Sequence, residues 1–98
     1  MKISQITDNN KMTISLSGRL DTVTSPELDK FIEEKTDGIE HLVLDLKDLE
    51  YTSSAGLRVF LKAQKKMSKQ GSLVLKNVCS DIMDIFSMTG FDEILTIE

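Results

Sequence analysis

Three consecutive hydroxyl side chains, Thr52, Ser53 and Ser54, are followed by the small residues Ala55 and Gly56. A hydroxyl where a helix begins can cap the helix by accepting a hydrogen bond from an early amide. An exposed hydroxyl there can also accept a phosphoryl group, because free amides and the helix dipole stabilise the added phosphate. Capping is the commoner role. However, a glycine in the first turn weakens a helix by roughly 0.5–1 kcal/mol relative to alanine. Gly56 therefore indicates a close approach by another group, and it favours an uncovered, modifiable Ser54.

Other kinds of site have less support in the sequence. His41, Asp45 and Ser54 contain the groups of a hydrolytic triad, but His41 begins the strand whose far end leads to Ser54. The glycines are isolated, so there is no phosphate-binding or dinucleotide-binding motif, and the acidic residues lack calcium-loop spacing. Cys79 is the only cysteine, which excludes an intrachain disulfide and a four-thiolate zinc site and favours a small helix-start or core residue. We therefore expect neither an enzyme nor a metal-binding protein.

Composition predicts one ordinary globular domain. The chain has 98 residues, of which 40% are apolar and 29% charged, so we treat residues 1–98 as a single domain. Its net charge of −4 argues against nucleic-acid binding through a general electrostatic field. There is no apolar run of membrane-spanning length and no signal-peptide pattern. We expect a cytoplasmic protein that binds neither nucleic acid nor membrane.

The hydrophobic pattern predicts five strands and three helices. We expect a hairpin from strands at 2–7 and 12–17, turning at Asp8, Asn9 and Asn10, and then a loop at 18–24. A first helix starts with Ser25 as its N-cap and Pro26 as its first helical residue. The later elements are a strand at 42–46, a helix at 54–70, a strand at 72–76, a helix at 80–89 and a strand at 94–97.

Glycines support the predicted helix ends, since Gly38, Gly71 and Gly90 each follow one helix. The element order is then β-β-α-β-α-β-α-β. Strand–helix–strand units of this length favour parallel pairing with right-handed crossovers. The expected fold is α/β, a mixed sheet with an N-terminal hairpin and three helices packed on it.

Several motifs together resemble a known family. The segment Leu-Val-Leu-Asp-Leu at 42–46 and Ser-Ser-Ala-Gly-Leu at 53–57 resemble the central signature of bacterial STAS-domain anti-sigma factor antagonists. Gly-Arg-Leu-Asp at 18–21 is similar to the family's loop after the second strand, and Met-Thr-Gly-Phe at 88–91 to the end of its third helix. The resemblance covers essentially the whole chain, as a single STAS domain.

This resemblance implies a phosphoprotein that regulates transcription by partner switching. Such antagonists bind an anti-sigma factor, often a serine kinase, and so free a sigma factor. The kinase phosphorylates the antagonist and ends binding, and a serine phosphatase restores it. ATP and magnesium then belong to the partner kinase, the chain itself holds no cofactor, and we expect a monomer when it is free. The family's phosphoserine falls on Ser54, and the expected partner-binding residues are Asp21, Thr22, Ser53, Ser54, Ala55, Gly56 and Arg58.

Two departures from the family pattern leave alternatives open. Ser53 stands where many members have aspartate, so it is a rival phosphorylation site. Arg58 stands where glycine is common, one helical turn beyond Ser54, and we hypothesise that its guanidinium pairs with a phosphate there. Asp21 is either a partner contact or simply a turn residue. The alternative function is a STAS scaffold or small-ligand sensor that is never phosphorylated.

The helix after Ser54 also carries a basic stripe. Its members recur at helical spacing: Arg58, Lys62, Lys65, Lys66 and Lys69. A solvated helix face is the simpler interpretation, with the late lysines complementing the helix dipole. Electrostatic contact with an acidic partner is the alternative.

Overall fold

A β-hairpin starts the fold. The computed structural model describes all residues, Met1–Glu98, and β1 (Lys2–Asp8) pairs antiparallel with β2 (Lys11–Leu20) across a two-residue turn. Asn9, in that turn, has a left-handed φ of 55°, which asparagine tolerates better than most residues. The predicted hairpin is confirmed.

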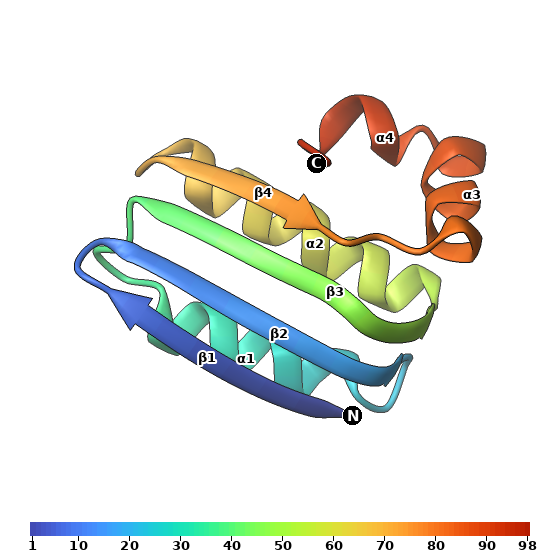
Figure 1. Cartoon of the computed structure of the whole chain (residues 1–98), viewed down its shortest axis with the longest axis horizontal. Coiled ribbons are helices and arrows are strands. Elements are labelled where there is room, and N and C mark those ends of the chain that lie inside the picture. The colour runs from blue at the N-terminus through green and yellow to red at the C-terminus, as the bar shows by residue number, and fades with distance from the viewer.

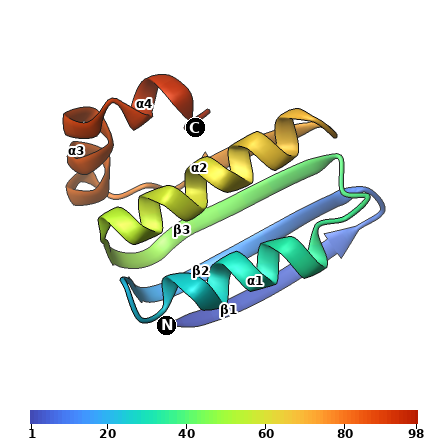
Figure 2. The same cartoon turned by 180° about the vertical axis from the view of Figure 1, so that it is seen from behind.

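The other strands join the sheet in parallel. Helix α1 (Ser25–Lys35) connects β2 to β3 (His41–Thr52), and α2 (Ser54–Ser68) connects β3 to β4 (Ser72–Lys76). The sheet order is β1-β2-β3-β4, so both crossovers step in the same direction. Crossovers of one hand then place their helices on one face. Figure 1 shows α1 and α2 side by side behind the sheet, and Figure 2 shows the same pair in front of the sheet from the opposite side.

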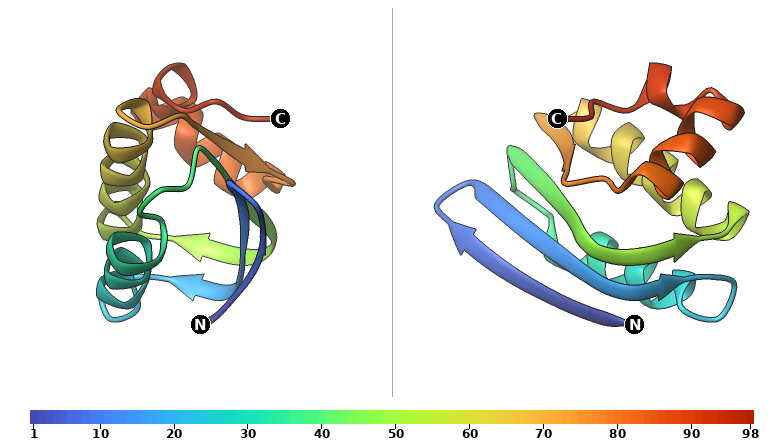
Figure 3. Two further views of the ribbon diagram at one scale, coloured as in Figure 1. Left: turned by 90° about the vertical axis from the view of Figure 1, so that its left-hand side faces the viewer. Right: turned by 45° about the vertical axis from the view of Figure 1, so that its right-hand side comes forward.

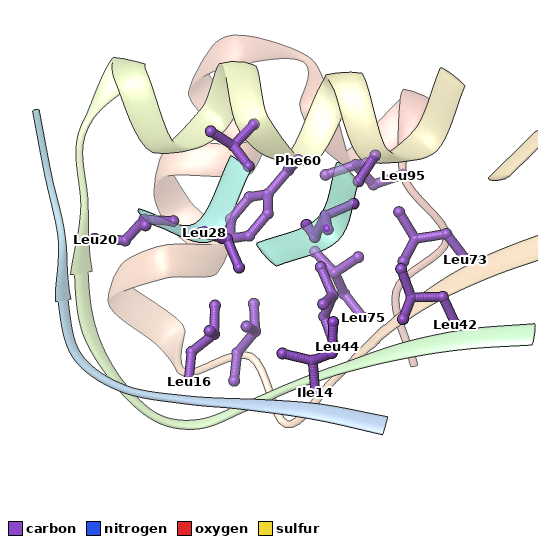
Figure 4. Packing of buried hydrophobic residues seen from close by; sticks show 14 of the residues in the cluster. Ile14, Leu16, Leu20, Leu28, Leu42, Leu44, Phe60, Leu73, Leu75 and Leu95 are labelled. Atoms are coloured by element: carbon purple, nitrogen blue, oxygen red, sulfur yellow. The ribbon is translucent and has the colours of Figure 1, made fainter. Parts of the chain in front are cut away.

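A single core fills the space between this sheet face and the helices. Leu42, Leu44 and Leu46 point into it from β3, while Asp45 lies on the other face, because side chains alternate along a strand. Figure 4 shows Phe60 of α2 reaching between the leucines of the strands. Its ring meets Phe86 edge to face, with centroids 6.1 Å apart and an interplanar angle of 82°. Burial of each such side chain stabilises the fold by roughly 1.5–3 kcal/mol.

The end of the chain differs from the prediction. Helix α3 (Ser80–Thr89) has the predicted bounds and ends at Gly90, a left-handed C-cap with φ 79°. The predicted strand at 94–97 is wrong, because Ile94 ends the short helix α4 (Phe91–Ile94) and residues 95–97 form no regular strand. Only Ile97 pairs with the sheet, through an isolated parallel bridge to Leu75. The α/β class and mixed sheet are confirmed, with four strands and four helices in the order β-β-α-β-α-β-α-α.

The other two predicted helix ends also shift. The first helix has Thr24 as its N-cap and Thr36 as its C-cap, so Ser25 is already its first residue. The second ends at Ser68, and Gly71 does not have a left-handed backbone. Gly71 is small for another reason: a Cβ there would collide with the carbonyl group of Glu40. No helix combines the length and apolar character needed to cross a membrane.

The carboxyl ends of β2 and β3 are where the fold positions the candidate site. The loop predicted at 18–24 is shorter than expected, because β2 continues to Leu20. Two register shifts against β3, one after Ser15 and one at Gly18, allow this extension, and Gly18 adopts φ 100°. The shifts bend the paired strands and bring the β2–α1 loop beside the start of α2, at the end of the sheet near α3 (Figure 3).

Candidate docking and modification site

The junction between β3 and α2 assigns different roles to the two serines. Ser53 has an extended backbone and is the N-cap, with its Oγ accepting a hydrogen bond from the Gly56 amide at 3.4 Å. Ser54 is the first helical residue, and its side chain is exposed and takes part in no hydrogen bond of the structure. The prediction that Ser54 could serve as the cap is therefore wrong, because Ser53 fills that position. The Ser54 hydroxyl remains uncovered at the positive end of a 15-residue helix.

Gly56 has a packing role. It is buried, and a Cβ at this position would collide with Thr52 Oγ1 and lie 2.8 Å from the side chain of Leu20. The group that approaches Gly56 closely, as the sequence indicated, therefore belongs to this chain. The first turn of α2 packs directly against the ends of β2 and β3. Gly56 is buried in the free chain, and its contact with a partner stays a prediction. Ser54 is exposed because its side chain points outward. The contribution of Gly56 is to let the helix pack closely against the strands.

Replacing this glycine tests the packing. We expect Gly56→Ala to lower the free energy of unfolding by about 1–2 kcal/mol, because overpacking typically costs about 1–3 kcal/mol. The higher helix propensity of alanine returns at most about 1 kcal/mol. Urea unfolding measures the difference, and Ala55→Gly controls for propensity alone. A Gly56→Ala variant as stable as the wild type would contradict the close packing.

The β2–α1 loop is organised around Asp21. Its Oδ1 accepts hydrogen bonds from the amides of Val23 and Thr24, both at 3.0 Å, and from Thr24 Oγ1 at 3.2 Å. Thr24 Oγ1 also bonds the Arg19 carbonyl, and Ser25 Oγ donates to the Asp21 carbonyl. The hydrogen bond from the Thr24 amide is the main cause that holds the pKa of Asp21 below its ordinary value of 3.8. Asp21 is therefore the turn residue that the sequence allowed, and its contact with a partner stays a prediction.

The lowered pKa gives Asp21 a specific pH signature. Because the folded chain holds the carboxyl ionised more readily than the unfolded chain, this group adds stability at neutral pH. That contribution disappears as the pH falls below 3.8 through the lowered pKa. We expect Asp21→Asn to be less stable than the wild type at pH 7, with the two converging in acid. Urea unfolding across pH measures this, with Glu34→Gln as a control for charge loss; a gap that persists unchanged to about pH 2 would contradict it.

A shallow depression of about 260 Å³ lies between the β2–α1 loop and the start of α2. Residues from the β2–α1 loop, α1 and the first turns of α2 line it: Thr22, Ser25, Pro26, Asp29, Ala55, Arg58 and Val59. The structure thus brings Thr22, Ala55 and Arg58 together at one depression, and their role in partner binding stays a prediction. Arg58 is exposed, makes no ion pair, and lies one helical turn from Ser54 on the same helix. Its guanidinium is free to bind an anion at this surface.

Three further residues of this edge, Arg19, Tyr51 and Val23, were not predicted as site residues from the sequence. The Arg19 guanidinium carbon lies 4.2 Å from the centre of the Tyr51 ring, a cation–π contact between neighbouring strands. Val23, in the Asp21 loop, is 85% exposed. Arginine and tyrosine are common at the energetic centres of interfaces. Their pairing follows a register shift beside Gly18, which no pattern in the sequence indicates.

The basic stripe of α2 is partly used within the chain. The Nζ of Lys62 lies 3.1 Å from Asp29 and 3.5 Å from Glu33 on α1, and Lys66 lies 2.9 Å from Asp37. The hydrogen bond to Asp29 is the main cause that raises the pKa of Lys62. The stripe thus helps to join α2 to α1, and Lys65 is among the lysines that remain free.

The remaining sequence candidates lie elsewhere. His41 bonds Ser72 at 3.0 Å at the amino end of β3, and Asp45 bonds Asn77, so neither meets Ser54. The absence of a hydrolytic triad follows from this separation. Cys79 is partly buried as the N-cap residue of α3, which agrees with the prediction of a helix-start residue. No three His, Cys, Asp or Glu side chains converge in a way that could hold a metal ion.

Comparisons with known proteins identify the family. The STAS domain profile matches residues 2–98. The anti-sigma-B factor antagonist of Bacillus subtilis (strain 168) is 33% identical over 92 residues, which cover 92% of this chain and 84% of that protein. The chain belongs to the STAS-domain family of anti-sigma factor antagonists. The anti-sigma-B factor antagonist of Listeria monocytogenes is 31% identical to this STAS domain over 94 residues, which cover 93% of this chain and 82% of the relative.

Solved structures agree on the fold. An anti-sigma factor antagonist from Mycobacterium paratuberculosis superimposes on this STAS domain with a TM-score of 0.88 and 24% identity, over 98% of this chain and 83% of that one. The Bacillus cell fate determinant SpoIIAA in its phosphorylated form gives a TM-score of 0.76 and 15% identity, over 99% and 91%. At these identities the likeness shows a common architecture.

Proposed function

We propose that this STAS domain is an anti-sigma factor antagonist whose binding is switched by phosphorylation of Ser54. In its unmodified form it docks an anti-sigma factor of the serine-kinase type and so frees a sigma factor. Phosphate on Ser54 ends docking, and a serine phosphatase restores it. The exposed, unbonded Ser54 hydroxyl at the first residue of α2, beside the Asp21 loop, carries this proposal.

The start of α2 suits an added phosphate. The first four amides of a helix have no acceptor within it. Here the Ser53 amide donates to the Leu20 carbonyl at 2.8 Å, and the Gly56 amide donates to Ser53 Oγ. The amides of Ser54 and Ala55 stay available to phosphate oxygens, as does the guanidinium of Arg58. The modified chain therefore keeps its fold while its surface changes by about −1.5 to −2 charges.

The transfer itself needs little from this chain. Ser54 Oγ attacks the γ-phosphorus of ATP held with magnesium by the partner kinase, and the hydroxyl proton passes to a base of that kinase. The bond between the γ-phosphorus and the β-phosphate oxygen breaks, and ADP leaves. In the reverse half of the cycle, water attacks the phosphoserine on the phosphatase and releases inorganic phosphate. Exposure and a fixed backbone at Ser54 are the contributions of the antagonist.

The geometry favours Ser54 over its rival. The Ser53 hydroxyl is half-buried and engaged as the helix cap, so its modification would remove the cap, which contributes roughly 0.5–2 kcal/mol. Ser54 loses no hydrogen bond when it is modified.

Mass spectrometry with matched variants tests the proposal. The wild type, Ser53→Ala and Ser54→Ala are each mixed with the cognate anti-sigma factor kinase, ATP and magnesium. We expect one added phosphate on the wild type and on Ser53→Ala, mapped to Ser54, and none on Ser54→Ala. Circular dichroism confirms that each variant is folded. Phosphate on Ser54→Ala would transfer the site to Ser53, and no phosphate on any chain would favour the scaffold or ligand-sensor function.

A further inference from the structure

The two edges of the sheet differ in whether another segment pairs with them. Along the β4 edge, the Leu75 amide donates to the Thr96 carbonyl and the Glu98 amide donates to the Leu75 carbonyl, both at 2.9 Å. The C-terminal segment thus covers part of that edge. Nothing pairs with the outer side of β1, which Figures 1 and 3 show as the free border of the sheet.

The register of the hairpin indicates which backbone groups of β1 are free. Asp8 pairs with Lys11 across the two-residue turn, and the closing pair of such a turn is hydrogen-bonded. Hydrogen-bonded and non-hydrogen-bonded pairs alternate along an antiparallel ladder. The N–H and C=O groups of Ile3, Gln5 and Thr7 therefore point away from β2, where no strand accepts them.

This edge lacks the usual protection against pairing. Its register with β2 is continuous, so β1 contains no bulge, and it contains neither proline nor glycine. No charged residue lies between Lys2 and Asp8. Ile6 is 76% exposed on the strand. Natural proteins generally protect an exposed edge with bulges, prolines or central charges.

The strand is also complementary to itself. An antiparallel pairing of two β1 strands about Gln5 places Ile3 opposite Thr7, and Gln5 opposite Gln5 of the second copy. These are the residues with free backbone groups, so each such pair can exchange two hydrogen bonds. The same register places Lys2 of one copy opposite Asp8 of the other, twice by symmetry. Neither side chain has an ion-pair partner within the chain.

We propose that this edge binds a second copy of the chain, joining two sheets through β1–β1 pairing about a two-fold axis at Gln5. The arrangement is isologous and closes as a dimer. A stable interface buries on the order of 1,600 Å². One short strand pair buries less, so the dimer is weak and forms with rising concentration. At low concentration the chain is then the monomer that we expected from the sequence. β1 pairs with β2 only as far as Ser17, and the carboxyl ends of β2 and β3, where Ser54 lies, extend past it. This inference is therefore independent of the function of Ser54.

Charge reversal at the strand ends tests the register. Lys2→Glu alone, and Asp8→Lys alone, each place two like-charged pairs in a homodimer. Opposed like charges replace attractive pairs, so we expect each variant to dimerise about tenfold more weakly than the wild type. A mixture of the two variants restores opposite charges in both pairs, so the heterodimer should return to wild-type strength. Sedimentation equilibrium up to about 1 mM measures these affinities, which are low for so small an interface.

Controls separate register from net charge. Lys69→Glu makes the same charge change at the far end of α2, and it should dimerise like the wild type. Hydrogen exchange provides a second readout: protection of the Ile3, Gln5 and Thr7 amides should rise with concentration, while the Ser4 and Ile6 amides, already paired with β2, change little. A monomer at every concentration, without that alternating protection, would overturn the proposal. So would a dimer that the mixed variants do not restore.

Discussion

Ser54→Asp is expected to weaken docking to the anti-sigma factor by more than about 100-fold. Ser54 is exposed beside the Asp21 loop, so a partner that covers this edge must desolvate any charge placed there. A buried charge without compensation costs about 3–5 kcal/mol, which corresponds to at least a hundredfold in affinity. Ser54→Ala removes a hydroxyl that makes no hydrogen bond within the chain, and it should bind within a few-fold of the wild type and resist the kinase. Isothermal titration calorimetry with the purified anti-sigma factor measures both.

A matched variant controls for charge at a distance. Ser68→Asp introduces the same group at the opposite end of α2, where it is also exposed. Surface charges separated by more than a Debye length, about 8 Å in physiological salt, are largely screened, so its docking should be nearly unchanged. If Ser54→Asp bound as tightly as the wild type, the phosphorylation switch would lose its physical basis.

Phe60→Ala is expected to lower the free energy of unfolding by about 3–5 kcal/mol, the range for removing a large buried aromatic side chain. Phe60 is fully buried in α2 and packs edge to face on Phe86, which links α2 to α3. A domain of this size is stable by about 5–15 kcal/mol in total, so the variant loses a large share of the free energy of unfolding. Urea unfolding followed by circular dichroism measures the loss.

A loss of stability this large is expected only for a buried side chain. Val23→Ala shortens a side chain that is 85% exposed, and it should change the stability by less than about 0.5 kcal/mol. Phe60→Leu keeps most of the buried volume and should fall between the two. A loss below about 1 kcal/mol for Phe60→Ala would contradict the packing of α2 against α3.

Local patterns predicted the hairpin, β4 and α3, because alternation, turn residues and a left-handed glycine determine those elements within a few residues. The same glycine signal had a different cause at Gly71, where the nearby Glu40 carbonyl leaves no room for a Cβ. This contact joins segments that are distant in the sequence, so the pattern around Gly71 could not reveal it. The end of α2 was therefore predicted from the wrong signal. The final strand failed for a similar reason. The apolar residues at 94–97 suit a strand, but Ile94 ends α4, Leu95 packs in the core, and only Ile97 forms a bridge to the sheet.

At the site, the sequence predicted an uncovered Ser54 hydroxyl but did not identify Ser53 as the helix cap. One residue separates an N-cap from a first helical residue, and that difference depends on the extended backbone of Ser53. The Arg19–Tyr51 contact depends on a register shift between strands, which composition and spacing do not encode. Of the two roles left open for Asp21, the turn role is confirmed, because an aspartate followed by Thr24 can form a hydrogen-bonded turn from neighbouring residues alone.

The hydrogen bonds that one oxygen of Asp21 accepts have a consequence for how a partner is recognised. They hold the β2–α1 loop in one shape before any encounter, and α2 beside it is fixed by its buried face. We therefore expect a partner that binds this edge to lose little conformational entropy in ordering the loop. In such a pre-ordered complex, substitutions along this edge are expected to change the residence time more than the rate of encounter.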